Sequence, residues 1–519
     1  MRRPVLTFAL LLSLVLSLLP IVPASAAAHS TISWAPCQED ATVECGTLTV
    51  PVDWNKPGGQ TFELALARRK AADPAARIGS LVINPGGPGG SGVDVVVNGW
   101  LSFTPEITSR FDVVGFDPRG VARSHPILCS GELAGQAPDP LSLKSQADFE
   151  ALLAFNERYR QDCRSRTGPL FDQVHTGNVV RDLDALRAAL GDDKLSYYGV
   201  SYGTLIGQQY AERYPSRVRA LALDSNVDHS LGTTAFLDTE AWAAQDSFDE
   251  FVAWCDRTAS CALHGRDTRA LWKKLLVRAD RGELHLSGQP EITLTKSGLI
   301  KQAFIAFYGP AYKELAEFLV ALESGQTAQP IIPPAPAQEE VNDTSQVFCQ
   351  DFLLPIRDYR EYARLLRRSA AIAPDMLVSS AAHQLAIPCL GTPGPIPNPQ
   401  RRLNVSGTPT LLLGNAVHDP ATAYPWAVNA ARQIGREARL LTYEGWGHGI
   451  YGRGECPTAA FDNYLVSLTV PGKGARCPAM PPADLSTLSA RSLPGPVPGL
   501  PVLVPGLVPG LPGWVPTAR

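Results

Sequence analysis

The sequence predicts an α/β fold with a mostly parallel sheet flanked by helices. Three observations lead to this prediction. Short runs rich in Val, Ile and Leu recur before turn residues, as buried strands do, and capped amphipathic helices lie between some of them. Apolar residues make up 45% of the 519 residues and charged residues 18%, which excludes a disordered chain and a polytopic membrane protein. Chains that alternate strands and helices in this way form mostly parallel sheets.

Six segments are expected to be strands. In chain order they are residues 79–83, 111–116, 195–200, 218–223, 410–413 and 438–443. Residues 178–190 are expected to form a helix, because Val179, Leu183 and Leu186 follow helical spacing and Gly191 stands at the end. A second helix is expected over 202–214, since Pro215 follows directly and disfavours further helix.

Residues 231–400 depart from the alternation of strands and helices and are expected to be an insertion. They hold helical segments at 268–279, 297–307 and 311–322 and the Pro-rich stretch 329–338. The strand and helix pattern then resumes. We therefore divide the chain into a core in two parts, 29–230 and 401–480, the insertion 231–400, and two terminal segments, 1–28 and 481–519.

Residues 1–28 have the three-part pattern of a secretory signal peptide. Arg2 and Arg3 precede an apolar run over 5–19, and the small residues Ala24-Ser25-Ala26 follow. A membrane anchor is the alternative, but the run is shorter than the ~20 residues that span a bilayer. We expect a secreted, extracellular protein with no integral membrane segment in its mature chain.

All ten cysteines lie beyond residue 28, and an even number in an exported chain predicts disulfides. A zinc site is the alternative, but no Cys-x-x-Cys pair occurs, and no metal is expected. Sequence alone leaves the connectivity open. Neighbours along the chain suggest Cys37 with Cys45, Cys129 with Cys163, Cys255 with Cys261, Cys349 with Cys389 and Cys456 with Cys477.

The C-terminal segment repeats a Pro-Gly-Leu/Val theme over 493–515 that can sustain neither a helix nor a strand ladder. It is either a spacer that associates the protein with the cell envelope or a dispensable terminus. The net charge of −4, with 46 Lys and Arg against 50 Asp and Glu, argues against nucleic acid as a partner.

The pentapeptide Gly199-Val200-Ser201-Tyr202-Gly203 matches G-x-S-x-G and lies between an expected strand and an expected helix. Such a strand-turn-helix setting exposes the serine at the carboxyl edge of the sheet, and flanking glycines leave room for the tight turn. The motif alone is weak, and the alternative is a serine in an ordinary turn. The setting makes Ser201 the candidate nucleophile.

A serine nucleophile needs a base and a group that orients the base. In the α/β-hydrolase order of serine, acid and histidine, Asp419 follows the late strand 410–413, with Asp462 and Asp351 as weaker rivals. His448 lies in a Gly-rich loop just after the last strand of the core, so it is the candidate base, and the neighbouring His418 is set aside.

Residues 84–92, Asn-Pro-Gly-Gly-Pro-Gly-Gly-Ser-Gly, follow the strand that ends at 83. Glycines leave backbone N–H groups uncovered, so this loop is expected to supply the first oxyanion donor, Gly87. The N–H of Tyr202 is expected to be the second. A phosphate-binding loop is excluded because no G-K-[ST] occurs and the G-x-G-x-x-G spacing does not match.

Several segments resemble the secreted tripeptidyl aminopeptidases of actinomycetes, within the prolyl-aminopeptidase-like α/β hydrolases. These segments are 45–53, the loop 84–92, 115–120, 198–204 and the C-terminal part from 447 to 477. The resemblance implies an α/β-hydrolase core with a mostly helical cap, and an exopeptidase that releases short peptides from free N-termini. It also implies that cap carboxylates hold the substrate ammonium group, with Asp351 in Cys349-Gln350-Asp351 as a candidate whose alternative is a structural carboxylate.

The sequence departs from that family at three places. Asp419-Pro420-Ala421-Thr422 replaces the usual Asp-x-Val-Thr-Pro, the Trp-Pro that usually follows the cap cysteine is missing after Cys389, and Asp224-Ser225 replaces Asp-Gly. These changes leave the substrate preference open, and none removes a member of the Ser-Asp-His triad.

The main hypothesis is a secreted serine exopeptidase that takes peptide or protein N-termini as its substrate and forms an acyl-enzyme on Ser201. A carboxylesterase or lipase with the same triad is the alternative, because acyl transfer to serine serves both bonds. A non-catalytic binding protein is disfavoured because all catalytic parts are present. Serine hydrolysis requires no cofactor, and none is expected.

Overall fold

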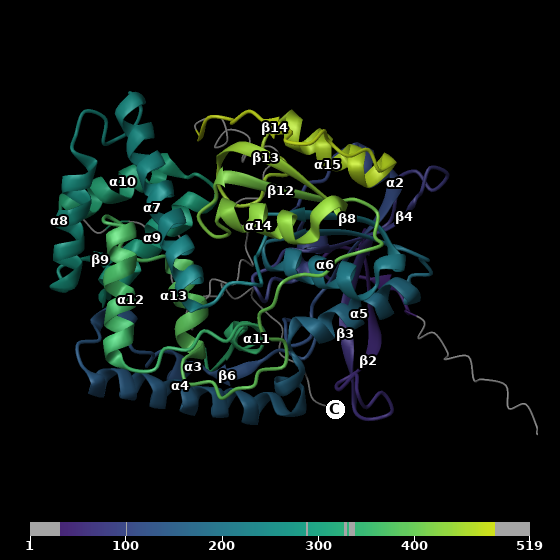
Figure 1. Cartoon of the computed structure of the whole chain (residues 1–519), viewed down its shortest axis with the longest axis horizontal. Helices are drawn as coiled ribbons and strands as arrows, with labels where there is room; N and C mark the ends of the chain where they lie inside the picture. The colour runs from purple at the N-terminus through teal and green to yellow at the C-terminus, as the bar shows by residue number, and fades with distance from the viewer. Residues whose placement is uncertain are drawn as a thin grey trace, which may run out of the picture.

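The computed structural model describes residues 32–99, 101–286, 289–325, 328, 330–331 and 338–482 (Figure 1). The expected signal peptide, almost all of the Pro/Gly-rich tail and most of the Pro-rich stretch 329–338 lie outside the described residues.

A ten-stranded sheet forms the centre of the core, in the order β1-β2-β3-β5-β4-β7-β8-β12-β13-β14. The strands β1 to β3 and the β3–β5 pair are antiparallel, and all pairs from β5 through β4 to β14 are parallel. The mostly parallel sheet is therefore confirmed. The ten strands are β1 Ala35–Pro36, β2 Glu44–Pro51, β3 Thr61–Arg69, β4 Gly79–Asn84, β5 Phe111–Phe116, β7 Leu195–Val200, β8 Val218–Asp224, β12 Leu411–His418, β13 Ala438–Trp446 and β14 Arg476–Cys477.

Side chains of the central strands alternate between two apolar layers because successive strand residues point to opposite faces. On one face Leu221 and Leu223 of β8 pack with α5 (Thr176–Ala189), α6 (Tyr202–Arg213) and α14 (Tyr424–Ile434). On the other face Ala220 and Ala222 pack with α1 (Gly92–Asn98), α2 (Pro105–Arg110) and α15 (Glu455–Ser467). The sheet is thus covered by helices on both faces, and in such sheets ligands bind outside the carboxyl ends of the strands.

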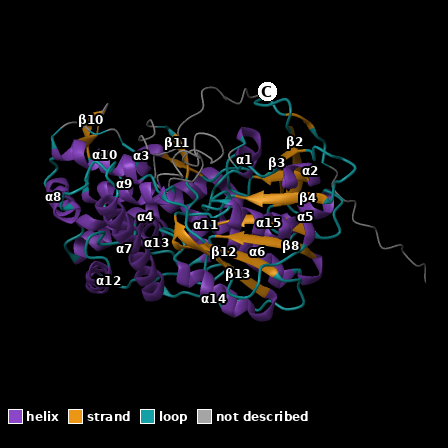
Figure 2. Cartoon of the chain, turned by 90° about the horizontal axis from the view of Figure 1, so that it is seen from above, coloured by secondary structure: helices purple, strands orange, loops and turns teal. Residues whose placement is uncertain are grey.

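The chain between β8 and β12 is mainly helical and has its own apolar core, built around the buried Trp272. These helices lie beside the sheet rather than on its faces (Figures 1 and 2), and we call them the cap. The cap consists of α7 Thr233–Arg257, α8 Thr268–Asp280, β9 His285–Leu286, β10 Gln289–Thr293, α9 Lys296–Tyr308, α10 Tyr312–Glu323, β11 Glu340–Asn342, α11 Ser345–Asp351, α12 Tyr359–Ile372 and α13 Ser380–Ala386.

One segment outside this insertion packs with the cap. The strand β6 (Leu128–Ser130) pairs with β11, and the short α3 (Gly131–Ala134) and the long α4 (Gln146–Thr167) follow it. The Asn156 side chain on α4 donates to the carbonyl oxygens of Ile387 and Leu390, at 2.8 and 3.1 Å. The sequence pattern did not predict α4, and this helix ties the first part of the core to the cap.

The ten cysteines form five disulfides with the pairing suggested by sequence neighbours. Cys129–Cys163 joins β6 to α4, and Cys349–Cys389 joins α11 to the turn after α13. Within the described ranges, no helix has the length and apolar character that crossing a bilayer requires.

Candidate active site

Ser201 occupies the sharp turn between β7 and α6, with φ 58° and ψ −124°. A non-glycine residue rarely adopts positive φ, so the fold holds this serine in a strained conformation. Gly199 and Gly203 make the turn possible, because a Cβ on either would lie under 3 Å from backbone oxygen atoms. The Ser201 N–H donates to the Asp224 carbonyl oxygen at 2.9 Å, which fixes the turn against β8.

The glycine loop after β4 lies against this turn. A Cβ on Gly86, which has φ 84°, would lie 2.3 Å from the Val200 oxygen and 2.8 Å from the Tyr202 nitrogen. Only glycine therefore fits here, and it leaves the Tyr202 N–H uncovered. That N–H has no hydrogen-bond partner in the part of the chain that the structure describes. Gly87 is the next residue of the loop, so the two expected oxyanion donors lie on neighbouring segments beside Ser201.

Asp419 is the first residue after β12, and His448 is the second after β13. The Nδ1 of His448 lies 2.9 and 3.1 Å from the two Asp419 carboxylate oxygens. Asp419 is 1% exposed and also accepts hydrogen bonds from the Thr422 hydroxyl and from the N–H groups of Ala421 and Thr422. Burial on its own raises the pKa of Asp419, but His448 and these N–H groups hold it below its ordinary value.

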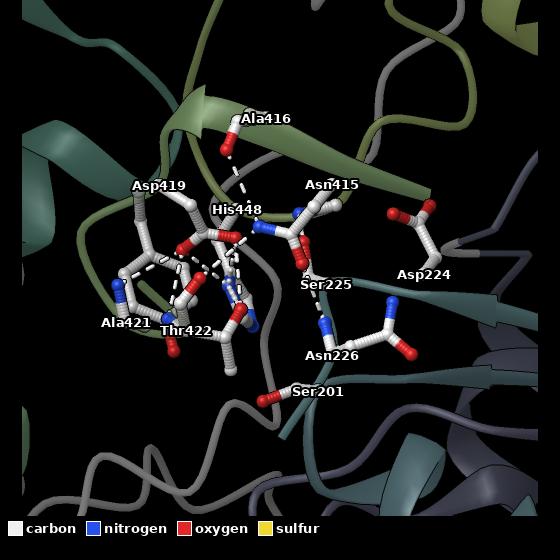
Figure 3. Close-up of polar contacts among 12 residues, drawn as sticks. Ser201, Asp224, Ser225, Asn226, Asn415, Ala416, Asp419, Ala421, Thr422 and His448 are labelled. Carbon is white, nitrogen blue, oxygen red and sulfur yellow. Dashed lines mark hydrogen bonds and ion pairs between the residues drawn. The ribbon is translucent and has the colours of Figure 1, made fainter. Parts of the chain in front are cut away.

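An ionised carboxylate can only accept hydrogen bonds, so the Asp419 contact places a proton on Nδ1 of His448. Its Nε2 atom is then free to accept one, and it is buried without a hydrogen-bond partner among the described residues. Figure 3 shows the imidazole between Asp419 and Ser201, with no hydrogen bond drawn to the serine. In structures without substrate, the hydrogen bond between such a base and its serine is often long, and it tightens when substrate binds.

A side chain of the cap packs against His448, the candidate base. The Tyr308 ring, at the end of α9, packs on the His448 imidazole with 4.6 Å between ring centroids. The His448 N–H donates to the Tyr308 carbonyl oxygen at 2.9 Å. The position of His448 therefore depends on the cap as well as on the sheet.

The two rival carboxylates have other contacts. Asp462 accepts hydrogen bonds from Thr104 and Tyr451, away from His448. Asp351 is fully buried and accepts from the Thr176 N–H and hydroxyl, the Tyr202 hydroxyl and the Asn398 amide. Both Asp351 oxygens are thus engaged in joining α11 to the core, and a role in binding an ammonium group would require breaking these contacts.

Glu240 on α7 is a further candidate that the sequence did not reveal. It is 1% exposed, its Oε2 accepts from the Ser379 hydroxyl at 2.7 Å, and its Oε1 has no partner among the described residues. Burial raises the pKa of Glu240 well above its ordinary value, and the nearby negative charge of Asp419 raises it further. No local motif marks this residue, because it lies inside a long helix and reaches the site only through tertiary packing.

His418 turns away from the triad towards the cap. Its Nδ1 lies 2.8 Å from the Asp246 carboxylate on α7, and its ring stacks on Trp446. No cluster of three or more His, Cys, Asp or Glu side chains within the described ranges could hold a metal ion. The arrangement of Ser201, His448 and Asp419 fits the expected nucleophile, base and orienting acid for acyl transfer.

Comparison with known proteins identifies the family. The protein-family model described as "alpha/beta hydrolase fold" matches residues 79–451, from β4 to the loop after His448. The chain belongs to the α/β-hydrolase family.

Curated relatives place this α/β hydrolase among serine peptidases. The "Serine protease Hip1" of Mycobacterium tuberculosis is 33% identical over 479 residues, which cover 86% of this chain and 91% of the relative. The "Tripeptidyl aminopeptidase" of Streptomyces coelicolor is 31% identical over 497 residues, with 88% and 87% covered. The family resemblance that the sequence predicted is therefore confirmed.

Two further comparisons complete these findings. The "Carboxylesterase B" of Mycobacterium tuberculosis is 30% identical to this α/β hydrolase over 482 residues, covering 86% of the chain and 89% of the relative. Among solved structures, the proline iminopeptidase of Mycobacterium smegmatis matches with 14% identity and a TM-score of 0.34, over 81% of this chain and 97% of its own.

Proposed function

We propose that this protein is a secreted serine exopeptidase that releases short peptides, tripeptides in the first instance, from free N-termini. The observation that carries this proposal is Glu240, a buried cap carboxylate that has no partner for its Oε1 among the described residues and lies near enough to Asp419 for that charge to raise its pKa. Secretion is proposed on two grounds, the signal-peptide pattern of residues 1–28 and five disulfides, which persist in oxidising compartments.

In the first half of the proposed reaction, Ser201 Oγ attacks the scissile carbonyl carbon while His448 Nε2 takes the serine proton. The N–H groups of Gly87 and Tyr202 stabilise the negative charge on the carbonyl oxygen. The tetrahedral intermediate collapses when His448 gives its proton to the leaving amine. This step breaks the peptide bond and leaves the N-terminal fragment as an ester on Ser201.

In the second half, a water molecule attacks the ester carbonyl and gives a proton to His448 Nε2. Collapse of the second tetrahedral intermediate returns that proton to Ser201 Oγ and releases the fragment as a carboxylic acid. Asp419 accepts the Nδ1–H bond throughout and stabilises the positively charged imidazole.

The ammonium group of a free N-terminus would bind the open oxygen of Glu240. Among the described residues the Glu240 carboxyl has only the Ser379 hydroxyl as a hydrogen-bond partner, and burial raises its pKa and so favours the protonated form. An ammonium ion supplies the missing partner, so its binding is expected to ionise Glu240 and release a proton. An N-acylated peptide carries no such charge and would bury an unpaired polar group instead.

The test is a panel of chromogenic amides with free and acetylated N-termini, carrying one, two or three residues, beside short-chain and long-chain esters. Wild type is expected to prefer the free tripeptidyl amide, and Ser201→Ala to cleave nothing. Glu240→Gln is expected to lower kcat/KM for free-amine substrates by about 10- to 100-fold, the loss of a hydrogen bond to a charged group.

Asp238→Asn is the matched control, since it removes a carboxylate two residues away on α7 that pairs with the exposed Arg368 instead. Equal turnover of free and acetylated amides would overturn the aminopeptidase assignment. Turnover in Ser201→Ala would overturn the mechanism.

An esterase is the second candidate, favoured by the 30% identity to the relative named carboxylesterase B. The same acyl-enzyme would form on an ester. Turnover of esters without cleavage of any amide in the panel would establish this alternative.

A further inference from the structure

A strained residue lies behind the catalytic histidine. Ser225 directly follows β8, is fully buried and has φ 62°, in the left-handed region that favours glycine. A non-glycine residue in this region costs about 1–2 kcal/mol. Ser225 therefore carries a backbone strain that glycine would avoid.

The Ser225 side chain makes a contact that glycine could not make. Its hydroxyl oxygen accepts a hydrogen bond at 2.8 Å from the N–H of Gly449, the residue after His448. The Asp224 carboxylate accepts from the next two N–H groups, those of Ile450 and Tyr451, at 2.9 and 3.0 Å. Three consecutive N–H groups after the catalytic histidine therefore donate to two consecutive side chains (Figure 3 labels Asp224, Ser225 and His448).

Ser225 is itself fixed to the sheet. Its N–H donates to the Gly414 carbonyl oxygen of β12 at 2.8 Å, while Asp224 is held by the Tyr198 hydroxyl at 2.8 Å. The hydroxyl that reaches Gly449 thus projects from a rigid point between β8 and β12. A rigid support matters for a catalytic group, because a misplacement of about 1 Å can cost ~100-fold in rate.

The loop that carries His448 needs such support. Gly447 and Gly449 flank the histidine, and both have positive φ, at 94° and 76°. Glycines lose more conformational freedom on folding than other residues, so this loop has a weak intrinsic preference for one conformation. The His448 side chain is held by Asp419, and its backbone N–H donates to the Tyr308 carbonyl oxygen. On its C-terminal side, the His448 carbonyl oxygen accepts from the Arg453 guanidinium at 3.1 Å, and the next N–H, that of Gly449, donates to the Ser225 hydroxyl.

We propose that Ser225 is a positioning residue that holds the His448 loop, and that its backbone strain is retained because the hydroxyl fixes the imidazole relative to Ser201. This inference rests on the proposed roles of Ser201 and His448. It adds a residue that does not touch substrate and acts through the Gly449 N–H.

Ser225→Gly separates the two effects, because it removes both the strain and the hydroxyl. We expect an equal or higher Tm, a kcat per active site about 10-fold lower, and an unchanged KM. The substrate is whichever member of the panel wild type cleaves and Ser201→Ala does not, and active sites are counted by mass spectrometry after exhaustive fluorophosphonate labelling. Ser225→Ala keeps the strain without the hydroxyl and should lower both Tm and kcat. If this variant does not fold, kcat of Ser225→Gly still tests whether the hydroxyl positions His448.

Leu468→Gly is the matched control. Leu468 also has positive φ, at 60°, but it is 46% exposed at the end of α15. Its replacement should raise Tm and leave kcat unchanged. A wild-type kcat in Ser225→Gly would overturn the inference, while the absence of Ser201-dependent turnover in wild type would overturn the proposed function first.

Discussion

The core and the cap place their functional side chains in different ways. Ser201, Asp419 and His448 all lie in turns directly after strands of the core. Glu240 lies inside the helix α7 of the cap, and Tyr308 is the last residue of α9. Turns at strand ends need particular residues, so they leave a local signature, whereas a helical residue becomes functional only through the packing of its helix. Under the proposed function, the chemistry belongs to the core and the choice of substrate to the cap.

The largest expected effect concerns the core. Asp419→Asn should lower kcat about 10⁴-fold on every substrate, because an amide cannot stabilise the charged imidazole and favours the wrong tautomer. Steady-state kinetics on amides and esters would measure this. Asp462→Asn, which alters the rival carboxylate bonded to Thr104 and Tyr451, should leave kcat within a few-fold. A comparable loss in both variants would contradict the assignment of the acid.

A second contrast concerns stability. In the core, Arg119 and Asp182 form a fully buried ion pair with two contacts of 2.6 Å. Removing one partner with Asp182→Asn should cost about 3–5 kcal/mol of unfolding free energy, since a buried charge loses its partner. In the cap, Asp238→Asn breaks the exposed pair with Arg368 and should cost about 0–1 kcal/mol. Denaturant unfolding measures both, and equal losses would show that the core pair is not energetically distinct.

The smallest effect concerns the contact between the two regions. Asp246 on the cap raises the pKa of His418 above its ordinary value of 6.5, although burial opposes this. The groups that face His418 are Asp246 and Glu250 on α7 and the Trp446 ring on β13. Protonated His418 pairs with Asp246, so this stabilisation is fully present below pH 6.5 and is lost as pH rises through the raised pKa.

Asp246→Asn should therefore lower Tm more at pH 5.5 than at pH 9, by an amount equivalent to about 1 kcal/mol or less. Thermal unfolding at the two pH values measures the difference. A loss of Tm that does not depend on pH would show that the pair contributes without titration of His418.

Local patterns explain which features could be predicted from the sequence. The six expected strands are confirmed because apolar runs are local properties, and the disulfides join cysteines that are neighbours in chain order. The strand β12 extends to His418, past the predicted end at 413. The prediction stops early because Asn415 interrupts the apolar run. Its amide is satisfied inside the core by the Thr422 carbonyl and the Asn226 N–H, which no local pattern reveals.

The contacts of two cap carboxylates could not be predicted from the sequence. Asp351 was predicted from a Cys-x-Asp segment, yet its oxygens are occupied by Thr176, Tyr202 and Asn398, which come from distant parts of the chain. Glu240 is one of several acidic residues along α7, and its burial and open oxygen depend on Ser379 and the neighbouring helices. Such properties follow from tertiary contacts, not from composition or spacing.

The division of labour between core and cap is tested most directly by comparing two rates in wild type and Glu240→Gln. One is the second-order rate of Ser201 labelling by a small fluorophosphonate, which carries no ammonium group. The other is kcat/KM for a free-amine tripeptidyl amide. The account predicts an unchanged labelling rate and about a 10- to 100-fold loss of peptide turnover in the variant. A parallel fall in both rates would contradict it, because Glu240 would then support the catalytic core and not the recognition of the substrate amine.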